Sequence, residues 1–369
     1  MPKYLVKIVL FSAPLLLVLT FPFLVYVYGR EFTPLQTVVE LQKRSSPVLF
    51  LPAYDQKIKA FKTMSIISIN PEIITIGSSR VYTFRSSFFK PGAEFYNAGG
   101  VGGFPQDLSN FIKKIPNDSR LKVIIIGIDQ RLLNPTFVAT GEHDNKQNPP
   151  EDISPAKRLS NFLAGGWILP YQDYFSGKFS LSLLVQQYKD TRNVGISALI
   201  DEMGFEKDGG LVRGHTLKSP EQVKADIAEK VNNIITPTLG AYQYNTKISE
   251  EGVRYIEEFL ALAHEREIYV VGFTSPFASA LYDKILSLND EYAATMLEIP
   301  ERLRTVFKKY GYPFYGLDDP RSYGSSDEEL IDKDHITEKG AARILLYMAE
   351  RDKIINQYAD INQLKDLTR

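Results

Sequence analysis

The chain has 369 residues, of which 44% are hydrophobic and 24% are charged, and its formal net charge at pH 7 is −1. This composition is typical of a folded protein with enough apolar material for one large domain or two smaller ones. Lysine and arginine form no continuous basic stripe, so nucleic acid is not an expected partner. The chain contains no cysteine, which excludes thiol nucleophiles, disulfides and cysteine-based metal sites and fits a protein outside a reducing compartment.

An uncharged apolar run occupies residues 8–28 near the N-terminus. Its length is sufficient to cross roughly 30 Å of bilayer hydrocarbon. Lys3 and Lys7 precede the run, so we expect the short leading end to stay cytoplasmic and the rest of the chain to be exported. A cleavable signal peptide is the alternative, but its apolar core is usually shorter and no small-residue cleavage pattern follows this run. We therefore predict that residues 1–30 form a cytoplasmic tip and one uncleaved transmembrane anchor.

The predicted globular part begins at residue 71, after a proline-containing juxtamembrane connector at residues 31–70 with a short helix near 35–43. Short apolar or β-branched runs then alternate with amphipathic helical patterns. The runs lie at residues 71–80, 94–97, 122–129, 268–276 and 313–319, and the helical patterns at 105–115, 250–265, 287–310 and 338–354. Because strands alternate with helices, we expect residues 71–369 to form an α/β domain with a mostly parallel sheet covered on both faces.

A long stretch at about residues 133–248 interrupts this alternation. It contains several proline and glycine pairs among short aromatic and helical pieces. We interpret it as an insertion on the side where the strands have their carboxyl ends, because open α/β sheets form their binding sites there.

Residues that could carry chemistry stand at the end of the first predicted strand and near the C-terminus. Ser78 and Ser79 follow the first strand in the sequence GSSR, where a hydroxyl can be exposed at the edge of the sheet. A serine hydroxyl becomes a good nucleophile when a base removes its proton, and that base needs a carboxylate to orient it. Asp332 and His335, in the sequence DKDH, could supply both groups. The negative oxygen formed during attack also needs donors, which the glycine-rich NAGGVGG at residues 97–103 could provide.

Four blocks in this order resemble the SGNH or GDSL-like hydrolases and acyltransferases: GSSR, NAGGVGG, GIDQ at residues 127–130, and DKDH. The resemblance implies a flavodoxin-like three-layer domain. It implies Ser79 as nucleophile, His335 as base and Asp332 as the orienting carboxylate. It also assigns the oxyanion donors to Ser79 and Gly102, and Gly99 and Gly100 are nearby alternatives to Gly102.

Two blocks depart from the pattern of the family. Asp129 stands where the family has an asparagine that donates a hydrogen bond, and an ionised carboxylate cannot donate. Either Asp129 is protonated, or Gln130 or another group replaces it, or this contribution is missing. Ser78 stands where the family name has an aspartate, a variant associated with membrane-anchored members that act on cell-surface polymers. Those members include proteins similar to the D-alanyl transfer protein of teichoic acids and the alginate O-acetylation proteins.

Each block also has a purely structural interpretation, as a turn, a flexible loop or a helix cap. Outside the blocks, Arg213 and His215 follow a glycine-containing loop and could contact an anionic or sugar ligand. No grouping of histidine, aspartate and glutamate has convincing metal-ligand spacing. We therefore expect neither a metal nor a cofactor.

These observations predict a single-pass, extracytoplasmic serine acyltransferase, most simply one that O-acetylates a cell-surface or exported polysaccharide. The expected partners are a polysaccharide or acylated glycan, the membrane, and a membrane-bound protein that supplies the acyl group. An esterase with the same triad is one alternative, and a non-catalytic glycan-binding member of an envelope assembly is another. A glycoside hydrolase would need paired carboxylates, for which Asp129 and Asp332 are the only candidates that the sequence suggests.

Overall fold

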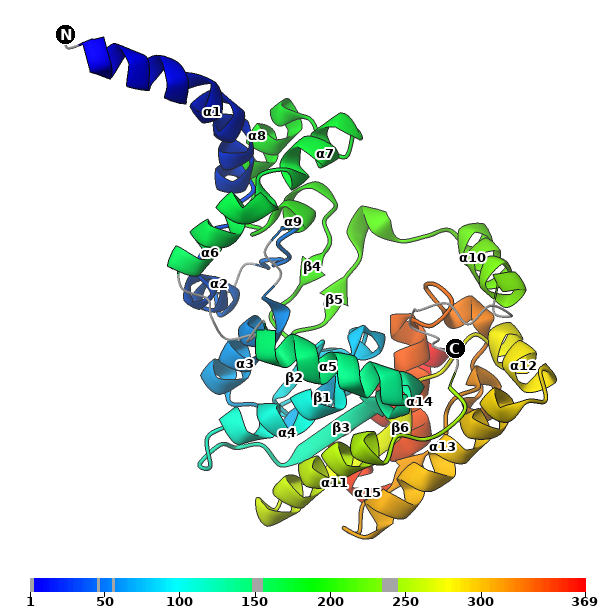
Figure 1. The fold of residues 1–369 in the computed structure, drawn as a ribbon. Helices are drawn as coiled ribbons and strands as arrows, with labels where there is room; N and C mark the ends of the chain where they lie inside the picture. The colour runs from blue at the N-terminus through cyan, green and yellow to red at the C-terminus, as the bar shows by residue number, and fades with distance from the viewer. Residues whose placement is uncertain (1–2, 45–46, 55–56, 148–154, 234–244) are drawn as a thin grey trace. The chain divides into compact units, whose positions relative to one another are not determined.

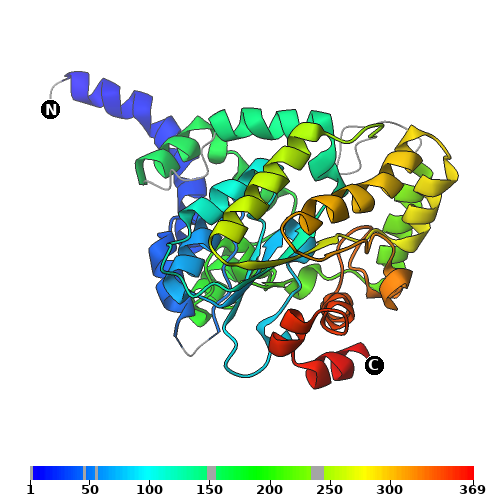
Figure 2. The same ribbon diagram turned by 90° about the horizontal axis from the view of Figure 1, so that it is seen from below.

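The computed structural model describes residues 3–44, 47–54, 57–147, 155–233 and 245–369 (Figures 1 and 2). Residues 1–2 of the predicted cytoplasmic tip, and residues 148–154 and 234–244 of the predicted insertion, lie outside the described residues. The chain divides into two compact units. The first comprises Met1–Ala60, Pro150–Lys207 and Leu211–Thr216, and the second comprises Phe61–Pro149, Asp208–Gly210 and Leu217–Arg369.

The second unit is built on a sheet of five parallel strands in the order β2-β1-β3-β6-β7. The strands are β1 (Ile73–Gly77), β2 (Phe95–Gly99), β3 (Val123–Ile128), β6 (Tyr269–Thr274) and β7 (Phe314–Tyr315). Every residue of β1, β2 and β3 is buried, because helices cover both faces of the sheet and leave no strand face in water. The predicted α/β class with a mostly parallel sheet is therefore confirmed.

Two hydrophobic clusters lie on opposite faces of this sheet, and successive strand residues point into each in turn. Val123 and Ile125 belong to one cluster, whereas Ile124 and Ile126 belong to the other. The helices of the unit are α3 (Ile58–Ile69), α4 (Pro105–Lys114), α5 (Pro135–Gln147), α10 (Pro220–Asn233), α11 (Glu250–Glu265), α12 (Ser279–Ser287), α13 (Glu291–Lys308), α14 (Glu338–Ala349), α15 (Lys353–Tyr358) and α16 (Ile361–Thr368). Helices α4 and α11 pack against each other on the face that holds Ile124 and Ile126, and α14, α15 and α16 cover the other face.

The first unit is mainly helical. Its elements are α1 (Lys3–Tyr28), α2 (Leu35–Gln42), α6 (Pro155–Asn161), the π-helical turn η4 (Phe162–Gly166), α7 (Leu169–Phe175), α8 (Leu181–Asp190), α9 (Ile196–Ile200), and the antiparallel strands β4 (Gly204–Phe205) and β5 (Leu211–Val212). The buried carboxylate of Glu31 ties its segments together, because it accepts hydrogen bonds from the N–H groups of Ala53, Tyr54 and Ile196. Among the helices that the structure describes, none combines the length and the hydropathy that are needed to cross a membrane.

Two boundaries differ from those expected. Most of α3 lies in the second unit and places Ile66 in its core, although the sequence assigned residues 31–70 to a connector. The predicted insertion contributes to both units, since α5 and α10 belong to the second unit and α6 to α9 to the first. Both differences arise because amphipathic helices of a connector and of a core look alike in sequence.

Candidate active site

Ser79 stands at the carboxyl end of β1, directly after a turn that needs glycine. Gly77 has φ of 155°, and a Cβ atom there would lie 2.7 Å from the carbonyl oxygen of Gly127 on the neighbouring strand. Ser78 follows in extended conformation, and its Oγ accepts a hydrogen bond of 3.2 Å from the N–H of Arg80. This cap starts the short 3₁₀ helix η1 (Ser79–Val81) and leaves the Ser79 side chain partly exposed. The strand-to-helix turn therefore presents the Ser79 hydroxyl at the edge of the sheet that is formed by the carboxyl ends of the strands.

The structure brings Ser79, His335 and Asp332 together. The Oγ atom of Ser79 lies 2.9 Å from Nε2 of His335. The other ring nitrogen, Nδ1, lies 2.9 Å from both carboxylate oxygens of Asp332. The three side chains thus form a hydroxyl–imidazole–carboxylate relay with hydrogen-bonding distances at each step.

The spacing of three residues between Asp332 and His335 has a local cause. Oδ1 of Asp332 also accepts the backbone N–H of Asp334 at 3.0 Å and that of His335 at 2.9 Å, which folds the loop around the carboxylate. The N–H of Ile331 donates to the carbonyl of His335 at 2.7 Å and closes the loop. The carboxylate is therefore fixed by backbone donors before it orients the imidazole.

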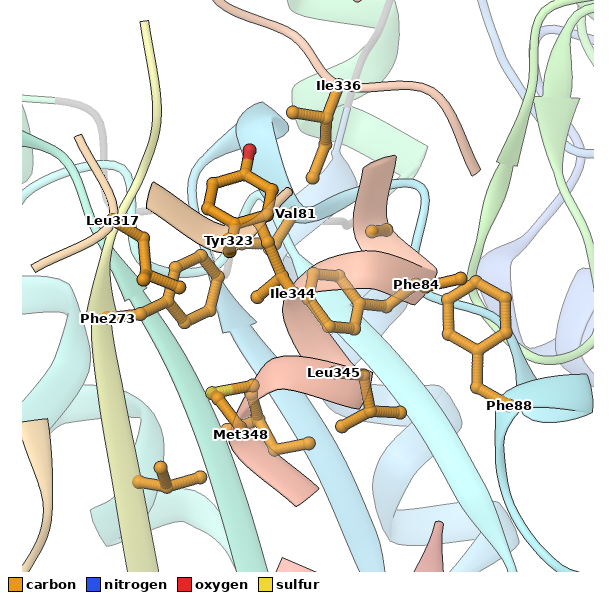
Figure 3. Packing of buried hydrophobic residues seen from close by; sticks show 14 of the residues in the cluster. Val81, Phe84, Phe88, Phe273, Leu317, Tyr323, Ile336, Ile344, Leu345 and Met348 are labelled. Atoms are coloured by element: carbon orange, nitrogen blue, oxygen red, sulfur yellow. The ribbon is translucent and has the colours of Figure 1, made fainter. Parts of the chain in front are cut away.

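A hydrophobic cluster holds the backbone on both sides of this relay. Val81 follows Ser79 by two residues and is fully buried, and Ile336 follows His335 directly and is 2% exposed. Both side chains belong to the cluster drawn in Figure 3, together with Phe84, Phe273 and Ile344. Segments that are 256 residues apart in the chain are thus held together by one packed core.

The imidazole of His335 has a raised pKa. Burial alone would disfavour the imidazolium, but hydrogen bonds with Asp332 and Asp334 and their negative charges outweigh it and raise the pKa of His335 to about 9. Burial also disfavours the ionised carboxylate of Asp332, yet the hydrogen bond with His335 and its charge hold the pKa of Asp332 far below its usual value. The two carboxylates beside Nδ1 therefore favour the imidazolium over the neutral ring.

Asp334 is a second carboxylate at the imidazole, which the sequence did not identify as part of the site. Its Oδ1 lies 3.3 Å from Nδ1 of His335, and its side chain is mostly buried. The ligand atoms of Asp332, Asp334 and His335 all lie within 4.8 Å of one another, the one such group among the described residues that could hold a metal ion. An ion would need Nδ1 unprotonated, whereas the relay needs the Nδ1–H to donate to Asp332. These two uses exclude each other, and the expectation of a metal-free site stays a prediction.

Arg80, the residue after Ser79, also belongs to the candidate site, although it was not predicted from the sequence. Its side chain is 6% exposed, and its Nε donates to the carbonyl of Asp334 at 2.9 Å. Nη1 donates to Oε1 of Gln130 at 3.1 Å, Nη2 donates to the carbonyl of Pro276, and the guanidinium stacks on the ring of Phe277. A single guanidinium therefore joins the loops that follow β1, β3 and β6 to the loop that carries His335.

Gln130 extends this network to the loop after β7. Its Nε2 donates to Oδ1 of Asp318 at 2.5 Å and to the carbonyl of Ser275 at 2.9 Å. Thr274 at the end of β6 donates to Oδ2 of Asp318 at 2.7 Å. Burial raises the pKa of Asp318, and these hydrogen bonds oppose that shift. The side chain of Gln130 is thus engaged in holding loops together, so the structure does not leave it free to replace the missing asparagine donor.

The predicted oxyanion donors have different surroundings. The N–H groups of Gly100 and Gly102 both donate to the carbonyl of Gly77, at 2.9 and 3.0 Å. The N–H of Gly99 donates to the side chain of Asn97 at 2.8 Å. By contrast, the Ser79 N–H has no acceptor within the part of the chain that the structure describes. Of the predicted backbone donors, the Ser79 N–H is thus the one that is available. The N–H groups of the three glycines already donate to Gly77 or Asn97 and so fix the conformation of the glycine-rich loop.

Asp129, the residue in place of the asparagine donor, lies between two cations. Its side chain is 2% exposed, with one oxygen 3.2 Å from Nε of Arg131 and the other 3.7 Å from Nη1 of Arg80. Neither carboxylate oxygen has a hydrogen-bond partner among the described residues. Asp129 thus belongs to an ion-pair network with the loop residues Arg80 and Arg131.

The remaining predicted residues lie elsewhere. Arg213 and His215 belong to the first unit, not to the unit that holds Ser79, and His215 lies 3.7 Å from the carboxylate of Glu202. Their predicted role as ligand contacts stays a prediction. A scan of known protein families, a search of curated proteins and a search of solved structures each found no match to this chain.

Proposed function

We propose that this chain is a membrane-anchored, extracytoplasmic serine acyltransferase with a flavodoxin-like domain. The observation that carries the proposal is the relay of Ser79, His335 and Asp332 at the carboxyl end of β1, with 2.9 Å at each step. The strand order β2-β1-β3-β6-β7 supports the flavodoxin-like topology, in which ligands bind outside the carboxyl ends of the strands.

In the proposed first half-reaction, Oγ of Ser79 attacks the carbonyl carbon of an acyl donor while its proton passes to Nε2 of His335. Asp332 stabilises the imidazolium that results, and the Ser79 N–H stabilises the negative oxygen of the tetrahedral intermediate. The intermediate collapses when the bond to the leaving group breaks and His335 returns the proton to that group. The product is an acyl ester on Ser79.

In the second half-reaction, a hydroxyl group loses its proton to His335 and attacks the ester carbonyl. The new ester leaves, and the proton returns from His335 to Oγ of Ser79. A sugar hydroxyl as acceptor makes the protein a transferase, and water makes it an esterase. The apolar N-terminal run and the resemblance of the four sequence blocks favour a polysaccharide acceptor, with O-acetylation as the simplest case.

The proposal is tested by labelling the full-length protein in detergent with a serine-directed fluorophosphonate. We expect one labelled residue, Ser79, and loss of labelling in Ser79→Ala. Ser87→Ala is the matched control, because Ser87 is exposed in the same unit and should leave labelling unchanged. Turnover of an acetyl ester should fall by about a thousandfold or more in Ser79→Ala. Labelling that persists in Ser79→Ala would refute the assignment of the nucleophile.

A non-catalytic role in binding glycans is a second candidate, which the surroundings of Asp129 favour. This residue lies between Arg80 and Arg131, and its carboxyl group stands where the enzymes that the four blocks resemble have an asparagine donor. The same labelling experiment separates the two roles. A wild-type protein that binds polysaccharide but reacts with no phosphonate would support the binding role.

A further inference from the structure

Large apolar side chains are exposed mainly in the first unit. On α1 the exposed group includes Phe11, Val18, Phe23, Leu24 and Val27. On η4, α7 and α8, and in the links between them, it comprises Leu163, Ile168, Leu169, Tyr174, Phe175, Leu181 and Leu183. Phe175 is 79% exposed and Leu163 is 54% exposed. Contiguous exposed apolar surface marks a site of contact with lipid or protein.

The exposed side chains of residues 162–185, named the apolar platform below, are carried by helices that pack beside the C-terminal half of α1 (Figure 1). The rings of Phe21 and Tyr171 stack with centroids 4.8 Å apart, and the Tyr171 hydroxyl donates to the carbonyl of Val18 at 2.7 Å. Phe162 lies edge-on to Tyr26 with centroids 5.0 Å apart. These contacts hold the platform next to α1, which carries exposed apolar side chains of its own.

The small number of charged residues in the platform favours lipid over protein as its partner. Residues 162–185 contain only two charged side chains, Asp173 and Lys178, and these pair with each other. Protein interfaces usually have a polar rim, whereas the headgroup region of a bilayer accepts leucine together with tyrosine and tryptophan. The only tryptophan of the chain, Trp167, lies in this segment next to exposed Ile168 and Leu169.

We propose that the apolar platform lies on the surface of a lipid bilayer, with its leucine and phenylalanine side chains in the boundary between headgroups and acyl chains. The platform would then add an interfacial contact to the one made by α1. Burying these side chains in lipid removes their apolar surface from water, which favours this placement. The inference shares with the proposed function only its membrane anchoring, and it does not depend on the chemistry of Ser79.

The absence of cysteine in the natural chain allows a direct test. Phe175→Cys and Leu163→Cys each introduce one thiol on the platform, and Leu297→Cys introduces one on α13. Leu297 is the matched control, because it is an apolar residue that is 55% exposed in the other unit. Each full-length variant is labelled with an environment-sensitive fluorophore and reconstituted in phosphatidylcholine vesicles that contain lipids with a nitroxide on the upper acyl chain.

We expect the probes at positions 175 and 163 to emit at shorter wavelength and to lose most of their fluorescence to the lipid nitroxide. The probe at position 297 should remain accessible to aqueous iodide and should not respond to the lipid nitroxide. The inference is overturned if positions 175 and 163 behave like position 297. It is also overturned if they are shielded from iodide without quenching by lipid, which would indicate a protein partner or a second copy. Phosphonate labelling of Ser79 in the same samples reports separately on the proposed function.

Discussion

Two carboxylates lie beside Nδ1 of His335, and in the proposed mechanism they determine the pH at which this residue can act as a base. Asp332 and Asp334 both lie near its Nδ1 atom and stabilise the imidazolium. Only the neutral imidazole can accept the proton of Ser79. If the proposed mechanism holds, the raised pKa makes the neutral imidazole, and with it the activity, increase above neutral pH.

We expect kcat/KM for an acetyl ester to rise by about tenfold per pH unit and to level off near pH 9, the pKa raised by the carboxylates. Asp334→Asn removes one negative charge without removing the relay, so the rise should shift to lower pH while the plateau is largely kept. Asp332→Asn should lower the plateau itself, because the imidazole loses its orienting partner. Rates measured across this pH range distinguish the two variants. An unchanged pH profile in Asp334→Asn would contradict the role given to Asp334.

Sequence patterns could identify three residues of the candidate site, but not the residues that hold these three in place. Ser79, His335 and Asp332 stand in short blocks whose chemistry is recognisable, and the structure brings them together. Arg80 could not be identified, because its partners at residues 130, 276 and 334 come together only in the folded chain. Gly102 was expected to donate to an oxyanion, but the turn of the backbone directs its N–H to Gly77.

The positions of the loops at the carboxyl ends of the strands depend on the hydrogen bonds of Arg80. Replacing this buried guanidinium would leave three acceptors unpaired, the carbonyls of Asp334 and Pro276 and the side chain of Gln130. We expect Arg80→Met to reduce the free energy of unfolding by about 3–5 kcal/mol and to lower turnover. Urea unfolding monitored by circular dichroism would measure the change in stability.

Arg254→Met is the matched control, because Arg254 pairs with Glu251 on the exposed surface of α11. Exposed ion pairs of this kind contribute little to stability. This variant should therefore unfold at nearly the same urea concentration as the natural protein. If Arg80→Met were as stable as Arg254→Met, the network would not hold the loops as described.

The strands of the sheet were predictable because buried parallel strands are short, apolar and bounded by glycine or polar residues. The runs at 71–80, 122–129 and 268–276 contain β1, β3 and β6. Strand β7 has only two residues, fewer than the predicted run at 313–319, because the chain turns away to place Asp318 against Thr274. Such long-range contacts set the ends of elements and are not visible in local sequence.

For the molecule as a whole, His335 links stability to pH. Its pKa is raised in the folded state, so the imidazolium stabilises the fold below the unfolded pKa of 6.5, and this contribution is lost as pH rises through about 9. We expect the free energy of unfolding to fall by roughly 3 kcal/mol across this interval. Urea titrations at several pH values would show the decrease, and His335→Gln should not show this part of it. A decrease of equal size in His335→Gln would assign the effect to other groups.

The division of the chain into two units could not be read from the sequence, which suggested one domain with an insertion. The short segment Asp208–Gly210 belongs to the second unit, although the residues on either side of it belong to the first. It joins the edge strand β2, where the carbonyl of Asp208 accepts the N–H of Asn97 at 2.7 Å. The carbonyl of Gly209 accepts a hydrogen bond from the buried ammonium of Lys62.

This three-residue segment also decides how the protein could be shortened. Removing residues 150–216 to isolate the second unit would also remove Asp208–Gly210, and the N–H of Asn97 and the ammonium of Lys62 would each lose an acceptor. The border of β2 would then be open to pairing with another chain, which favours aggregation. Precipitation of such a shortened protein would thus reflect the uncovered edge strand and would not show whether the second unit can fold.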